Sequence, residues 1–276
     1  MARVPRRSPF QHRPACSGPV KWKDFAALEA DIALAKEATA SSGTADVFFT
    51  SPSPGQIARY LKNQHYPSEE AYLYALADVM AREYRAIVDA GLVLQLDCPD
   101  LALSRHMVFA HLSLEEFRKV IATHVEALNH AVRDIPPERM RMHICWASTQ
   151  GPHHKDVPLK DIVDIVLKGR PQALSFPGAN PRHGHEWKVW KDVKLPDGKI
   201  IIPGVIDSTS NFVEHPELVA DRIVQYARVV GAQNVIAGVD CGFGTFAGRL
   251  QVDSKIVWMK LASLAEGARL ASKQLW

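Results

Sequence analysis

Apolar and polar positions divide the chain into short runs typical of buried strands, most of them followed by a longer segment with helical periodicity. The runs typical of strands cover residues 46–50, 92–96, 140–146, 173–176, 200–206 and 235–239. The segments predicted to be helical cover residues 68–90, 113–133, 159–167, 216–230 and 253–271. This alternation predicts an α/β fold in which helices cover a parallel sheet or barrel.

Local signals mark where several of these helices begin. Ser68 precedes two glutamates, so it is a predicted N-cap with acidic residues in the first turn. Ser113 and Glu116 have the spacing of a capping box. Pro216 fits the first position of a helix, and Gly91 ends the helix that Ser68 opens. These signals support the predicted order of elements.

Five polar side chains share one position, at or just past the C-terminal end of a predicted strand. They are Asp97, Cys145, Asp207, Asp240 and Cys241. In a (β/α)8 barrel of the TIM type, active sites are built on this rim. Because several residues share the position, packing alone explains them poorly. The pattern favours a barrel with a functional site at one end.

Three soft metal ligands stand out within this set. His143 and Cys145 are two residues apart in an extended segment, so their side chains point to the same face. Cys241 ends the last predicted strand. One imidazole and two thiolates make up most of a zinc site, and a catalytic zinc keeps an open position. The sequence therefore predicts zinc as the cofactor. The competing interpretation is that His143 and Cys145 are buried strand residues, since free cysteine is commonly buried.

Composition sets the context of this site. A chain of 276 residues with 47% hydrophobic and 23% charged residues is typical of a globular protein, and a single barrel domain over residues 14–276 fits its length. We expect residues 1–13 to be irregular or disordered, and the net charge of +3 does not indicate a nucleic-acid partner. The sequence contains no apolar run that predicts a membrane span. The four cysteines lack the spacing of a disulfide framework, which favours a cytoplasmic location.

Six segments carry motifs that are specific in combination. They are ACSGPV at 15–20, LQLDCPDL at 94–101, HIC at 143–145, NPRH at 180–183, IPGVIDS at 202–208 and DCG at 240–242. With these motifs the chain resembles the cobalamin-independent methionine synthase family in its C-terminal catalytic barrel. It is similar in particular to the single-barrel members called methionine synthase-like or epoxyalkane:coenzyme M transferase-like. The resemblance extends from about residue 14 to residue 276.

The resemblance implies a zinc-dependent methyl or alkyl transfer to a thiol, like that of 5-methyltetrahydropteroyltriglutamate–homocysteine S-methyltransferase in methionine biosynthesis. The implied partners are a homocysteine-like thiol and a methyl or alkyl donor. In such a reaction the metal holds the thiol as the nucleophilic thiolate. Asp97 would bind the amino group of an amino-acid thiol, and Asp207 would orient the substrate. Two alternatives stay open: thiol addition to a non-folate electrophile such as an epoxide, and a catalytically silent, truncated homologue.

Two departures from the family pattern bear on this interpretation. Family members carry two further strands before the ACSGPV segment, so we expect an incomplete barrel of six strands. Open sheet edges invite association, which predicts a homodimer or contact through the open edge. The second departure is Pro177, which stands where the family has a zinc-ligating glutamate.

Two interpretations concern the nearby polar residues of the segment 183–186. Glu186 is an alternative replacement for the ligand that Pro177 lacks. His183, His185 and Glu186 together are otherwise expected to form a hydrogen-bonded loop cluster, because they follow the predicted strand end.

Overall fold

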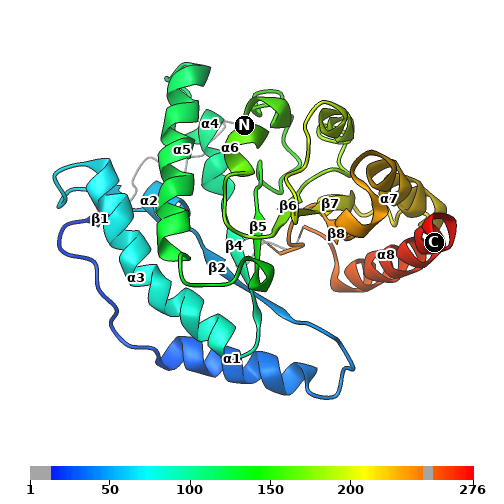
Figure 1. Cartoon of the computed structure of the whole chain (residues 1–276), viewed down its shortest axis with the longest axis horizontal. Helices are drawn as coiled ribbons and strands as arrows, with labels where there is room; N and C mark the ends of the chain where they lie inside the picture. The colour runs from blue at the N-terminus through cyan, green and yellow to red at the C-terminus, as the bar shows by residue number, and fades with distance from the viewer. Residues whose placement is uncertain (1–13, 245–250) are drawn as a thin grey trace, which may run out of the picture.

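The computed structural model describes residues 14–244 and 251–276, and its centre is a curled sheet of six parallel strands (Figure 1). The strands are β2 (Phe48–Pro52), β4 (Val93–Asp97), β5 (Met140–His143), β6 (Ala173–Phe176), β7 (Ile200–Ile206) and β8 (Gly238–Val239). Their order in the sheet is β2-β4-β5-β6-β7-β8, so each of them lies beside the next in sequence. This is the wall of a TIM-type barrel with open edges at β2 and β8 in the described part of the chain. The predicted fold class is confirmed.

The helices lie outside this sheet (Figure 1). They are α1 (Ala26–Thr39), α2 (Pro54–Tyr60), α3 (Glu69–Asp89), α4 (Ser104–Met107), α5 (Leu114–Ala131), α6 (Val163–Val166), α7 (Pro216–Val230) and α8 (Ser254–Leu275). Helix α3 contacts β2 and β4, whereas α7 and α8 contact β7. Two short strands, β1 (Ala15–Cys16) and β3 (Lys62–Asn63), form a separate parallel pair.

Short 3-10 turns complete the connections. They are η1 (Pro99–Leu101), η2 (Pro137–Arg139), η3 (Leu159–Asp161), η4 (Glu186–Lys191) and η5 (Ala232–Asn234). None of the described helices combines the length and the hydrophobicity of a membrane span.

The predicted helix starts are confirmed in detail. The Ser68 hydroxyl accepts a hydrogen bond from the Ala71 amide, and Ser113 forms a full capping box with Glu116. Pro216 is the first residue of α7. The N-terminal helices α1 and α2 were not expected from the sequence. The predicted segment 1–13 lies outside the described residues.

Three predicted elements are shorter than expected, among them the strand predicted at 235–239, which is only β8 at Gly238–Val239. The predicted strand 140–146 ends at His143, and the backbone then turns to reach a positive φ of 83° at Ala147. The indole N–H of Trp146 donates to the carbonyl of Val157, which draws this segment into the following loop. The predicted helix 159–167 is a 3-10 turn followed by one turn of α-helix.

Two apolar clusters support the sheet. The larger one packs β4 and β5 against α3 and α5, with Leu94, Leu96 and Phe117 fully buried. The smaller one packs Val205 and Ile206 of β7 against α7 and α8. Full burial of such a side chain contributes about 1.5–3 kcal/mol. The clusters fix the strands, and therefore the ends of the strands where the polar side chains lie.

Candidate metal centre and cavity

Neighbouring strands bring their last residues side by side. Asp97 of β4 pairs with His143 of β5, and His143 pairs with Ser175 of β6. A nitrogen of His143, Nδ1, lies 3.0 Å from the Ser175 hydroxyl. The register of the parallel sheet therefore sets the position of the imidazole at the C-terminal rim.

His143, Cys145 and Cys241 converge at this rim, as their positions in the sequence indicate. Their nitrogen and sulfur atoms all lie within 4.8 Å of one another, and the two sulfurs are 3.7 Å apart. The Ala147 amide donates to the Cys145 sulfur at 3.3 Å, so the turn that ends β5 also orients this thiol. The buried His143 Nε2 has no hydrogen-bond partner among the described residues. Such a donor set is a candidate metal centre.

The two cysteines differ in protonation. The hydrogen bond to Cys241 and burial both raise the pKa of the Cys145 thiol well above its usual range. The hydrogen bond from Cys145 lowers the pKa of Cys241 well below its usual range, against the effect of burial. These opposite shifts make Cys241 the more readily ionised thiol of the pair, with Cys145 as the donor of the hydrogen bond between them. A thiolate is the form that binds a metal.

Asp97 lies close to this centre. Burial raises the pKa of its carboxyl to about 6, and the nearby His143 imidazole opposes that shift. The carboxyl is therefore mostly ionised at neutral pH. Asp97 does not line the cavity that opens beside the centre.

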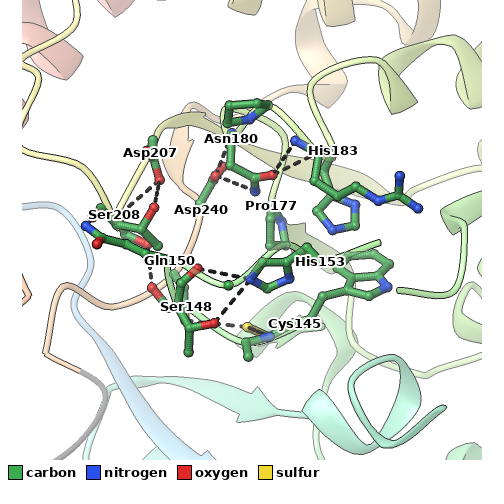
Figure 2. A pocket seen from close by; sticks show the side chains of 18 of the residues that line it. Cys145, Ser148, Gln150, His153, Pro177, Asn180, His183, Asp207, Ser208 and Asp240 are labelled. Carbon is green, nitrogen blue, oxygen red and sulfur yellow. Dashed lines mark hydrogen bonds between the residues drawn. The ribbon is translucent and has the colours of Figure 1, made fainter. Parts of the chain in front are cut away.

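A cavity of about 570 Å³ opens beside the centre (Figure 2). Its lining includes Cys145, Cys241, Pro177 and Asp207. The Asp207 carboxylate accepts hydrogen bonds from the backbone N–H and the hydroxyl of Thr209, at 2.9 and 2.8 Å. Asp207 thus combines a place in the cavity wall with the capping of its own loop.

Asp240 holds the segment after β6 against the end of β8. Its carboxylate accepts from the backbone N–H groups of Gly178 and Ala179 at 2.8 and 2.7 Å. It also accepts from the backbone N–H and the side chain of Asn180, at 2.8 and 2.9 Å (Figure 2). A Cβ on Gly204 would lie 2.1 Å from an oxygen of Asp240, so glycine is required at that position. The sequence placed Asp240 on the rim, but it gave no signal for this backbone cradle.

Pro177 and Glu186 have separate surroundings. Pro177 lies in the cavity wall, near the two cysteines. Glu186 accepts from the Leu159 amide at 2.7 Å and lies 2.8 Å from His183 Nδ1, in another cluster. The alternative that Glu186 replaces the missing ligand is therefore wrong for this structure. The expected loop cluster of His183 and Glu186 is confirmed, whereas His185 is exposed.

The loop cluster has two further members that sequence reasoning missed. His153 Nδ1 lies 2.7 Å from Asp156 Oδ2, and His183 Nε2 lies 3.0 Å from the same oxygen. Burial lowers the pKa of His183, but the hydrogen bonds to Asp156 and Glu186 outweigh this effect and raise the pKa to about 9. Asp156 follows no predicted strand, so no positional signal identified it.

Known proteins resemble this chain at the level of sequence and fold. No protein-family model matches it. It is 25% identical over 240 residues to a methionine synthase of Saccharolobus solfataricus. The aligned region covers 85% of this chain and 61% of the relative. A methionine synthase of Sulfurisphaera tokodaii is 23% identical over 237 residues, with 85% and 59% covered. The chain therefore spans about three fifths of the length of these curated relatives.

One solved structure extends the likeness to the fold. A B12-independent methionine synthase from Shewanella sp. W3-18-1, in complex with selenomethionine, superposes with a TM-score of 0.71 at 20% identity. The match covers 94% of this chain and 70% of that one. The curled parallel sheet and its outer helices are therefore an arrangement shared with that enzyme.

Proposed function

We propose, from the premise that the chain belongs to the cobalamin-independent methionine synthase family, that it transfers a methyl or alkyl group to a thiol with the help of zinc. The observation that carries the proposal is the convergence of His143, Cys145 and Cys241 beside a cavity large enough for a small substrate. The relatives are named methionine synthases, which favours a homocysteine-like thiol as the acceptor.

The three residues fit a zinc ion by their chemistry. Two thiols and one imidazole are zinc donors, and three protein ligands leave one position for a substrate. The buried Nε2 of His143 has no hydrogen-bond partner among the described residues, and its lone pair would coordinate the ion. When bound, zinc supplies a Lewis acid that keeps a substrate thiol deprotonated at neutral pH.

The chain's own residues would then bind and orient the reactants. Asp97 is ionised near neutral pH and lies beside His143, so its carboxylate would accept hydrogen bonds from the ammonium group of an amino-acid thiol. Asp207 lies in the cavity wall, where it would orient the second substrate. Holding both reactants beside the metal centre would replace a bimolecular encounter by a positioned attack.

Pro177 supports a second candidate, a homologue that keeps the barrel and has lost the chemistry. Proline offers no ligating atom, so the centre has one protein ligand fewer than the family pattern. Thiol addition to an epoxide-like electrophile would use the same metal-held thiolate.

Metal content and transfer activity of matched cysteine variants test the proposal. Cys241→Ser should lower bound zinc by one equivalent and lower methyl transfer from a methylated folate to homocysteine by at least about 100-fold. Cys16→Ser is the control, because this partly exposed thiol lies on β1, away from the centre. Full transfer by Cys241→Ser would refute the proposed role of zinc. If the chain binds zinc but transfers no group to a thiol, from either a methylated folate or an epoxide, the result would support the catalytically silent homologue.

A further inference from the structure

A buried group of ionisable side chains lies in the cavity wall apart from the cysteines. His153, Asp156 and His183 each offer one atom to a common point, and these atoms lie within 4.8 Å of one another. Asp156 and His183 have side chains only 1% and 4% exposed, and that of His153 is 16% exposed. His153 and His183 both line the cavity (Figure 2). The group comes from the loop after β5 and the loop after β6.

The outer nitrogen of each histidine is already committed. His183 Nδ1 lies 2.8 Å from Oε2 of Glu186, whose other oxygen accepts from the Leu159 amide. His153 Nε2 lies 3.0 Å from the Thr149 carbonyl oxygen. A carbonyl and a carboxylate oxygen only accept, so each outer nitrogen carries the proton.

The inner nitrogens therefore face a second acceptor. His153 Nδ1 and His183 Nε2 lie 2.7 and 3.0 Å from the same oxygen of Asp156. With the outer nitrogens protonated, a neutral ring presents a lone pair to that oxygen, which is repulsive. The arrangement requires either a second proton on each ring or a cation between the inner atoms. In the metal-free chain, His183 is doubly protonated near neutral pH, since its pKa is about 9. Both solutions add the same charge of two, so a bound divalent ion can take the place of the two protons.

Two further polar atoms favour the cation. Asp156 Oδ1 and His106 Nδ1 are buried and lie 3.3 Å apart, yet neither has a hydrogen bond among the described residues. Two imidazolium rings bound to Oδ2 would leave Oδ1 without a hydrogen bond, and with a charge partner only when His106 is protonated. An ion held by the inner atoms can take up the second carboxylate oxygen, with His106 as an additional donor close by.

We propose that His153, Asp156 and His183 form a second metal site, for a divalent transition-metal ion such as zinc, separate from the cysteine centre. Two imidazoles and one carboxylate favour such ions over magnesium or calcium, which prefer all-oxygen sites. Metal-binding histidines usually donate their other N–H to a carboxylate or a backbone carbonyl, and Glu186 and Thr149 supply these two acceptors. The site does not depend on the proposed transferase function.

Cobalt(II) titration of the full chain separates the two sites, because a thiolate ligand gives a sulfur-to-cobalt charge-transfer band that histidine and aspartate do not. The native chain should bind two cobalt ions. The Cys145→Ser, Cys241→Ser double variant should keep one ion without that band. Asp156→Asn should keep one ion with it, and His153→Gln should do the same if Asp156→Asn fails to fold.

The opposite results overturn the proposal. A folded double cysteine variant that binds no cobalt would exclude the second site, whatever the fate of the transferase proposal. So would histidine ring NMR that shows both nitrogens of His153 and His183 protonated in the presence of excess zinc. If the native chain binds one cobalt ion and shows no thiolate band, the result supports the second site and counts against the cysteine centre alone.

Discussion

Asn180 donates two hydrogen bonds to one oxygen of Asp240, from its backbone N–H at 2.8 Å and from its side-chain amide at 2.9 Å. This pair joins the segment after β6 to the end of β8. Cys241 follows Asp240 directly, and Pro177 lies three residues before Asn180. The cradle around Asp240 therefore sets how the last metal ligand lies relative to the cavity wall.

Asp240→Asn should destabilise the chain by about 3 kcal/mol, because an amide group would face backbone donors that now bind a carboxylate. Urea unfolding measures the loss, and zinc content of the folded variant should fall with it. Asp207→Asn is the control, since Asp207 accepts from Thr209 within its own loop. It should cost about 1 kcal/mol. An equal loss in both variants would contradict the role given to Asp240.

Lys260 and Glu214 form a buried ion pair that supports Asp207. The Lys260 side chain is fully buried, and its Nζ lies 2.9 Å from Oε2 of Glu214. The other oxygen of Glu214 accepts from the Asp207 amide at 2.8 Å. Lys260→Met should cost about 3–5 kcal/mol, because it leaves the carboxylate buried and unpaired.

A double-mutant cycle checks this interpretation. Adding Glu214→Gln to Lys260→Met should recover part of the lost stability, since the amide retains an oxygen for the Asp207 N–H and carries no charge. The exposed pair Glu115–Lys119, at 80% and 73% exposure, should show no measurable coupling in the same experiment. Additive losses at the buried pair would mean that the charges do not interact.

Pro177→Glu should raise zinc affinity on the order of 10-fold or more, because it adds a carboxylate to a cavity wall that already contains Cys145 and Cys241. Isothermal titration of the cysteine site measures the change. Pro177→Gln has the same shape without the charge and should leave the affinity nearly unchanged. Glu186→Ala should leave it unchanged as well, because Glu186 is bound to Leu159 and His183. Equal affinity in all variants would show that position 177 does not face the metal.

Zinc affinity of the cysteine centre should rise with pH. The pKa of the Cys145 thiol lies well above its usual range, so this thiol is protonated in the metal-free chain at neutral pH. It must lose its proton to bind the ion. Each proton released makes the apparent affinity about tenfold higher per pH unit. Titrations in buffers of different ionisation enthalpy count the protons. An affinity independent of pH between 6 and 8 would mean that the thiols do not bind the ion.

The sequence predicted the elements with strong local signals. Strands β6 and β7 and helix α7 have the predicted bounds, because Pro216, the turn at Gly198 and the apolar runs act locally. Helix α1 was missed since only Leu28 of it is buried, and such a helix lacks an apolar stripe.

The site residues likewise divide into those that local sequence signals predicted and those that they did not. His143, Cys145 and Cys241 were found because strand ends in a parallel sheet meet at one rim. The Asp240 cradle and the Asp156 cluster were not, because they depend on how loops from different strands fold over one another. The short β5 shows the same limit, since the turn at Ala147 is set by the distant contact between Trp146 and Val157.

The most direct test of a thiol-binding metal at His143, Cys145 and Cys241 is the sulfur-to-cobalt charge-transfer band of the cobalt-loaded chain, recorded before and after adding homocysteine. Two protein thiolates predict a band before addition. A substrate thiolate in the open position predicts that its intensity grows by about half, as the thiolates increase from two to three. A band that homocysteine leaves unchanged, or no thiolate band at all, would contradict the account.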